Sequence, residues 1–143
     1  MTTSRKLQAV IESVAASDGA GVKLRRSLGS RQNQRFDPFL MLDEFFSDDP
    51  DDYLAGFPSH PHRGFETVSY VLDGEIAHHD TNGGGGVIRE GDVQWMTAGS
   101  GILHDELPTE RAYRQGGPFH AVQLWVNLPK ALKMTPPRYQ SIT

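Results

Sequence analysis

Residues 66–75 have the sequence ETVSYVLDGE, a run rich in β-branched and aromatic residues that favours a β-strand. The run ends on Asp73-Gly74, a dipeptide typical of a tight hairpin turn. We therefore expect residues 75–80 to form the return strand of a hairpin, antiparallel to the first.

Further short segments with similar composition lie before and after this stretch. We expect strands in residues 22–28, 38–43, 87–89, 93–97, 102–107 and 120–128. In the last of these, Ala121, Gln123 and Trp125 alternate with apolar residues, as in a half-buried strand. Short strands separated by Gly-rich turns predict an all-β sandwich or barrel. Residues 6–16 fit a helix as well as a strand.

The composition is that of one soluble domain. The chain has 143 residues, 37% hydrophobic and 22% charged, with a formal net charge of −4. That charge argues against direct nucleic-acid binding, since the basic cluster Lys23, Arg25, Arg26 and Arg31 is small. No residue is a cysteine, so any metal must be held by nitrogen and oxygen ligands.

The N-terminus lacks the apolar stretch of a signal peptide, and no run reaches membrane-spanning length. We therefore expect a cytoplasmic protein without a membrane partner. The acidic loop at residues 47–52 lacks the glycine and the distal glutamate of an EF-hand, which favours a solvated loop over a calcium site.

Two short motifs carry metal-ligand chemistry: His60-Pro61-His62 and His104-Asp105-Glu106. Residues two apart on a strand share a face, so each motif presents two ligands on one side. Three imidazoles and a carboxylate suit Fe, Mn, Ni, Co or Zn, and an ion held this way keeps open positions for chemistry. Glu66 competes with Glu106, because it lies four residues after His62.

The other histidines have weaker signals. His78 and His79 are adjacent, so at most one can face inward, and we expect a surface pair. His120 begins a strand and is expected to be packed or partly exposed. The turn at residues 82–86 lacks the lysine and the Ser/Thr of a phosphate-binding loop.

Three segments together resemble the pirin family of the cupin superfamily. They are FPSHPHRGFETVSYVLDGE (57–75), GDVQWMTAGSGILHDELP (91–108) and VQLWVNLP (122–129). The resemblance implies a single-domain cupin jelly-roll β-barrel with one non-haem iron, Fe(II), held by His60, His62, His104 and Glu106. It also implies that Glu66 is not a ligand and instead orients a histidine through its free ring nitrogen.

Pirins are usually about twice this length. The resemblance therefore implies an N-terminal cupin domain at residues 1–128 and a Pro-containing tail at residues 129–143 that leads towards a second cupin domain. We expect that tail to be extended and without a core face. Without the second barrel, exposed apolar surface would favour a protein partner or a homo-oligomer.

Two functions follow from the resemblance. The first is a dioxygenase that opens the ring of quercetin or a similar flavonol, with Glu106 as a catalytic residue that either leaves the metal transiently or acts as general base on the 3-hydroxyl. The second is a non-enzymatic module that senses redox state through its iron and co-regulates transcription. In that case the basic cluster Lys23, Arg25, Arg26 and Arg31 is the expected docking face.

Overall fold

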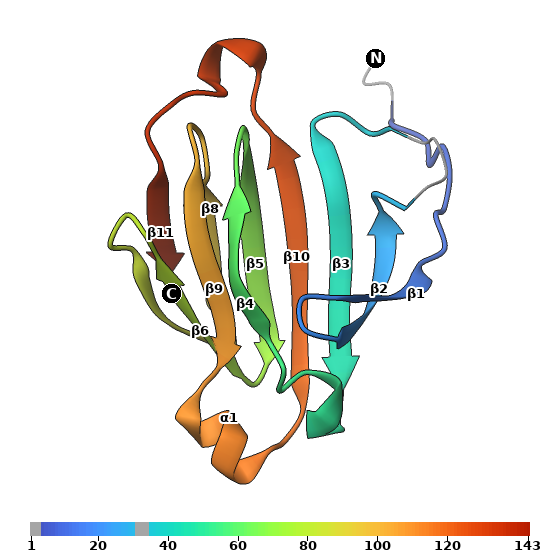
Figure 1. The fold of residues 1–143 in the computed structure, drawn as a ribbon. Coiled ribbons are helices and arrows are strands. Elements are labelled where there is room, and N and C mark those ends of the chain that lie inside the picture. Colours follow the sequence, from blue (N-terminus) through green and yellow to red (C-terminus); the bar gives the residue numbers. More distant parts are fainter. Residues whose placement is uncertain (1–3, 31–34) are drawn as a thin grey trace.

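The computed structural model describes residues 4–30 and 35–143, which form two antiparallel β-sheets facing each other (Figure 1). The seven-stranded sheet has the order β1-β2-β3-β10-β5-β8-β11, and the four-stranded sheet the order β4-β9-β6-β7. The strands of the larger sheet are β1 (Val14–Asp18), β2 (Val22–Leu28), β3 (Phe39–Ser47), β5 (Phe65–Asp73), β8 (Val93–Thr97), β10 (Phe119–Asn127) and β11 (Arg138–Ile142). Those of the smaller sheet are β4 (Phe57–His62), β6 (Glu75–Asp80), β7 (Gly85–Arg89) and β9 (Ile102–Pro108).

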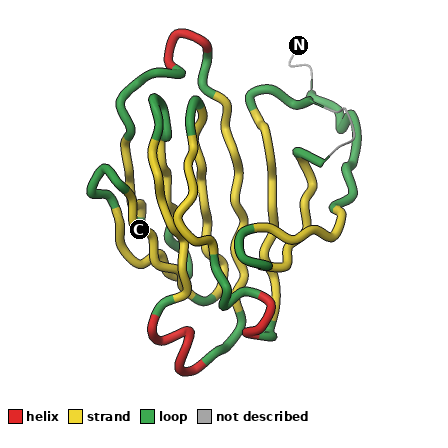
Figure 2. Tube along the Cα trace, in the orientation of Figure 1, coloured by secondary structure: helices red, strands yellow, loops and turns green. Residues whose placement is uncertain are grey.

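Helical segments are short and lie at the two ends of the sheets (Figure 2). They are the helix α1 (Glu110–Gln115) and single turns at Pro50–Asp52 and Lys130–Leu132. The sequence pattern did not predict α1, which begins where the Thr109 hydroxyl accepts a hydrogen bond from the Ala112 backbone N–H at 3.1 Å. The predicted all-β, single-domain fold is confirmed, and the expected strands appear close to their predicted bounds.

The hairpin predicted at Asp73-Gly74 is wrong. Strand β5 pairs with β10 and β8, whereas β6 pairs with β7 and β9 in the other sheet. Gly74 has a φ of +83°, and a Cβ there would lie 2.8 Å from the Pro118 carbonyl oxygen. The turn residues are thus used to carry the chain from one sheet to the other.

The tail ends in an extended strand, as predicted, but the prediction that it has no core face is wrong. Residues 138–142 form β11, which pairs with β8 so that Tyr139 lies opposite Met96. Tyr139 packs against a buried cluster made of Met96, Ala98 and Ile102. The last residues of the chain therefore extend the larger sheet and contribute to its core.

The inner surfaces of the two sheets contain an apolar part and a polar part. The apolar part is a cluster of nine buried residues: Val22, Leu24, Phe45, Tyr53, Val71, Ile76, Ile88, Phe119 and Ala121. The polar part includes Thr67, His78, Gln94, His104 and Glu106, all buried. Burying polar groups costs free energy unless they have hydrogen-bond partners. A cluster of them between the sheets therefore marks the region in which we look for a functional site.

The outer face of the larger sheet exposes large apolar side chains. By strand alternation Leu40 and Phe46 of β3 share this face with Tyr70 and Leu72 of β5, and Phe46 is 65% exposed. The ring of Phe46 packs edge-on against His120, with centroids 5.0 Å apart. His120 is partly exposed and contacts Glu44, as expected.

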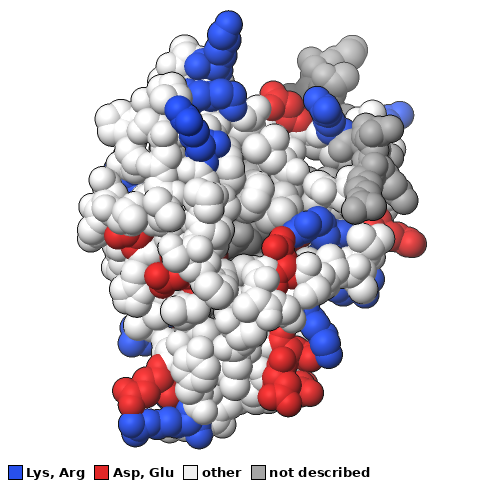
Figure 3. Space-filling view, in the orientation of Figure 1, with Lys and Arg blue, Asp and Glu red and all other residues white. Residues whose placement is uncertain are grey.

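In the view of Figure 3, Lys and Arg side chains gather at the upper end of the molecule, acidic side chains with further basic ones gather at the lower end, and the middle of this face carries fewer charges. Within residues 4–30 and 35–143, the structure has no helix long and apolar enough to cross a membrane.

Candidate metal centre

Strands β4 and β9 are neighbours in the smaller sheet and bring the two histidine motifs together. His60 lies directly opposite His104 in the antiparallel register, and His62 lies opposite Ile102. The Nε2 atom of His60 is 3.0 Å from the Nε2 atom of His62 and 3.0 Å from that of His104. The three imidazoles predicted from the sequence therefore converge on one point.

The proton positions follow from the hydrogen bonds. The Nδ1 atom of His60 lies 2.9 Å from the Pro58 carbonyl oxygen, which can only accept. We therefore assign the proton of neutral His60 to Nδ1, which leaves a lone pair on Nε2. Ligand atoms at right angles around an ion, with bonds of ~2.1 Å, stand about 3.0 Å apart. The spacing and the donor type thus fit a divalent transition metal.

Burial favours the uncharged imidazole. It lowers the pKa of His62 to about 4, with a smaller effect from the nearby His104 and His60. It lowers the pKa of His104 to about 3, again assisted by His60 and His78. Both side chains are consequently neutral near neutral pH, the form in which a histidine binds a metal.

Glu106 is buried and lies close to the histidines, but its surroundings differ from theirs. Its carboxylate accepts hydrogen bonds from the side-chain amides of Gln94, at 3.1 Å, and Gln123, at 3.0 Å. Two groups of side chains have possible ligand atoms within 4.8 Å of one another. One group consists of His60, His62 and His104, and the other of Glu106, His78 and His104. The assignment of Glu106 as fourth ligand stays a prediction.

The cluster opens into a cavity of about 420 Å³, a volume suited to a small organic molecule. Apolar side chains dominate its walls, among them Met41, Phe45, Phe57 and Trp125, and His60, His62 and Glu106 also line it. The ring of Trp125 stands 5.1 Å from that of His62, at an angle of 73°. Its Nε1–H donates to the Gln123 side-chain oxygen at 3.1 Å.

Gln123 and Trp125 were not predicted as site residues. The strict alternation of residues 120–128 placed both on the same side of a strand, and that signal was available. Neither residue type is specific to metal centres, so the sequence pattern alone did not mark them as part of a site.

Two predictions for individual residues are wrong. His78 is fully buried and contacts His104, so only His79, with a side chain 71% exposed, lies at the surface. Glu66 does not orient a histidine, because its carboxylate accepts from the Thr97 hydroxyl at 2.7 Å. The chain turns at Gly64, and Glu66 belongs to β5 of the other sheet, so its alternation with His62 is lost.

Each described member of the basic cluster has a polar partner. Arg26 donates to Asp43 and Asp18, with nitrogen–oxygen distances of 2.7 and 2.9 Å. Lys23 pairs with Asp52, and Arg25 donates to Ser13. Arg31, the fourth predicted member, lies outside the described residues.

Comparison with known proteins gives separate evidence on the family to which the chain is related. The model of the Pirin family matches residues 21–126. A Pseudomonas aeruginosa protein, whose name ascribes quercetin 2,3-dioxygenase activity to it only provisionally, is 54% identical over 89% of this chain and 43% of its own length. A pirin-like protein of Caulobacter vibrioides is 53% identical over 95% of this chain and 48% of its own length.

Among solved structures, quercetin 2,3-dioxygenase from Acinetobacter baumannii superposes with a TM-score of 0.80 at 45% identity. The match covers 96% of this chain and 49% of that protein. The chain thus spans about half the length of the relatives that it matches.

Proposed function

The chain belongs to the Pirin family, and we propose that it is a metal-dependent dioxygenase that acts on a flavonol such as quercetin. The observation that carries this proposal is the convergence of three imidazole Nε2 atoms at the end of a largely apolar cavity. The names of two similar proteins point to the same reaction. Because those relatives are about twice as long, activity of the chain itself is part of the proposal.

The donor set suits Fe(II), which we propose as the resident ion, and also accommodates Mn, Ni, Co or Zn. A bound Fe(II) would supply Lewis acidity towards the flavonol oxygens and redox chemistry towards dioxygen. His60, His62 and His104 would hold it, with Glu106 as the fourth ligand or as a base beside it.

The remaining residues of the cavity have distinct tasks in this proposal. The flat rings of Phe57 and Trp125 provide apolar walls for a planar aromatic substrate. Glu106 takes the proton of the flavonol 3-hydroxyl, and the amides of Gln94 and Gln123 hold its carboxylate in place. A substrate that fills the cavity excludes water from the reacting atoms.

The test is to load the protein with Fe(II), add quercetin under oxygen and follow the loss of its visible absorbance. We expect turnover in the wild type, none in His62→Ala, and a much reduced rate in Glu106→Gln, with the metal retained if Glu106 is the base and weakened if it is the fourth ligand. A wild-type protein that carries one ion per chain and leaves quercetin unchanged would contradict the proposal.

The alternative, a redox-sensing co-regulator of transcription, has less support. Its expected docking face consists of Lys23, Arg25, Arg26 and Arg31. Arg26 is instead engaged with Asp43 and Asp18 beside the cavity. Its partial burial between these two carboxylates, which line the cavity, fits a structural role better than a role in partner binding.

Self-association is a further part of the proposal. The exposed Phe46 and the neighbouring apolar residues on the outer face of the larger sheet give a surface that a partner or a second copy could cover. The absence of nucleic-acid and membrane partners, and a cytoplasmic location, stay predictions from the sequence.

A further inference from the structure

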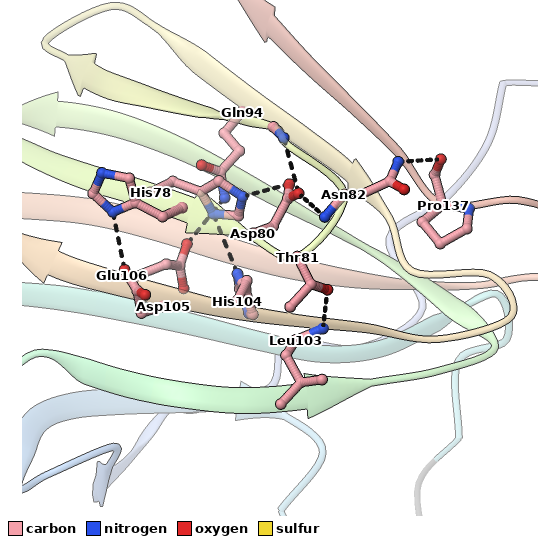
Figure 4. A network of polar contacts seen from close by, with 12 residues as sticks. His78, Asp80, Thr81, Asn82, Gln94, Leu103, His104, Asp105, Glu106 and Pro137 are labelled. Atoms are coloured by element: carbon pink, nitrogen blue, oxygen red, sulfur yellow. Dashed lines mark hydrogen bonds and ion pairs between the residues drawn. The ribbon is translucent and has the colours of Figure 1, made fainter.

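The fully buried residue His78 lies next to His104, on the side away from His60 and His62. The Nδ1 atom of His78 is 3.2 Å from the Nδ1 atom of His104, and its Nε2 atom is 3.1 Å from Asp80 Oδ2 (Figure 4). We propose that Asp80 and His78 are positioning residues that fix the tautomer of His104, so that its Nε2 atom presents a lone pair to the metal. This inference rests on the proposed metal centre.

The chain of hydrogen bonds starts at Asp80, whose role is set by the backbone. Its Oδ1 atom accepts from the backbone N–H groups of Asn82, at 2.8 Å, and Gly84, at 2.9 Å. Its Oδ2 atom faces His78 Nε2, and both side chains are completely buried. A carboxylate can only accept, so the proton of neutral His78 is assigned to Nε2, and His78 Nδ1 carries a lone pair.

The same logic continues to His104. Because His78 Nδ1 accepts, His104 must donate through its own Nδ1–H. The Nε2 atom of His104 is therefore without a proton, and it lies 3.0 Å from the Nε2 atom of His60. The hydrogen bond to Pro58 leaves His60 Nε2 without a proton as well. Two lone pairs thus face each other, an arrangement that a cation between them would stabilise.

Packing holds the ring of His78 in the orientation that this chain requires. The ring of Tyr139 stacks on it with centroids 4.7 Å apart and planes 15° apart. A Cβ atom at Gly84 would clash with Asp80 Oδ2 and lie 2.7 Å from the Tyr139 Cβ. The Asn82 side chain donates to the Pro137 carbonyl at 3.2 Å (Figure 4). The Gly-rich turn and the tail therefore both support the metal ligand.

The decisive variant is Asp80→Asn, which changes one atom and keeps the size of the side chain. The backbone N–H groups of Asn82 and Gly84 still require an oxygen, so the new NH₂ group takes the place of Oδ2 and donates to His78 Nε2. The two hydrogen bonds that link residue 80 to His78 and His78 to His104 then reverse their direction. His104 receives a proton on Nε2, at the position that the metal needs.

Two measurements test this on the whole chain. NMR of ¹⁵N-labelled imidazoles in the metal-free protein at neutral pH reports which nitrogen of His104 carries the proton. We expect Nδ1–H in the wild type and Nε2–H in Asp80→Asn. Calorimetric titration with Zn²⁺ should show an affinity about 10–100-fold lower in Asp80→Asn, the usual effect of losing an outer hydrogen-bond partner.

Further variants separate positioning from a general loss of structure. His78→Leu removes the acceptor and should weaken Zn²⁺ binding, whereas His78→Asn supplies an oxygen near the Nδ1 position and should restore most of it. His79→Asn, at the adjacent exposed residue, is the matched control and should bind Zn²⁺ like the wild type.

The outcomes distinguish the inference from the proposed function. An Nε2–H tautomer of His104 in the wild type, or an unchanged tautomer in a folded Asp80→Asn protein, would overturn the inference. A wild type with the expected tautomer that binds no metal would contradict the proposed metal centre and leave the assigned tautomer standing.

Discussion

His60 and His104 are cross-strand partners whose Nε2 atoms lie 3.0 Å apart. With the tautomers proposed above, neither nitrogen carries a proton, and the two lone pairs repel each other until a cation lies between them. If a metal binds the folded chain at the proposed site, its binding must also stabilise the fold.

Metal binding is expected to raise the melting temperature. Free Zn²⁺ at about 100 times its Kd stabilises a protein by about 2.7 kcal/mol, since it binds the folded state alone. A thermal scan should show a rise of several degrees in the wild type, reversed by EDTA, and none in His60→Ala. An equal rise in His60→Ala would show that the ion binds elsewhere.

Met96 is expected to be important for stability because it is fully buried against Tyr139 of the tail. Met96→Ala leaves a cavity, and we expect it to lower the free energy of unfolding by about 2–5 kcal/mol in urea denaturation. Leu103→Ala, at a residue 48% exposed, should change it by no more than about 0.5 kcal/mol. Similar values for the two variants would mean that the tail cluster adds little to the core.

Glu75 is expected to make stability depend on pH. Its hydrogen bond from Thr109, with help from Arg111 and Arg89, lowers the pKa of Glu75 below the ordinary 4.5. A carboxyl with a lowered folded-state pKa contributes stability that is fully present above its unfolded pKa and is lost as pH falls through the folded value. Urea midpoints of wild type and Glu75→Gln should therefore differ most near neutral pH and converge in acid. Glu90→Gln, at an exposed glutamate, serves as the control.

Phe46 is expected to mediate self-association through the outer face of the larger sheet. Light scattering across a concentration series should show a mass that rises with concentration in the wild type and stays lower in Phe46→Ser. Leu132→Ser removes a side chain of similar exposure away from this face and should behave like the wild type. A wild type that stays monomeric at every concentration would refute the expectation.

The sequence predicted the strands and the three converging imidazoles for local reasons. Alternation fixes which residues share a face, and His60 and His62 need only an extended backbone to point the same way. Pairing between strands is a non-local property, and the sequence signals did not contain it. Asp73-Gly74 has the residues of a hairpin turn, yet the turn joins two sheets. The reason is that β5 pairs with β8 and β10 rather than with β6.

The burial of His78 beside His104 was not predicted, for a related reason. Alternation requires that His78 and His79 point to opposite faces, but it does not say whether the inner face meets solvent or a buried polar cluster. The burial of His78 depends on β9 on one side and on Tyr139 from the tail on the other. Those contacts join residues far apart in the sequence, so no local pattern could reveal them.

The position of β11 has a practical consequence for protein engineering. A boundary drawn after Leu128, where the family resemblance implies that the first cupin domain ends, would remove the strand that pairs with β8. It would also remove the aromatic ring that stacks on His78, and we expect this to expose the interior behind the histidine cluster to water. A shortened version intended to carry the metal, or a fusion partner attached to it, should therefore retain the residues through Ile142.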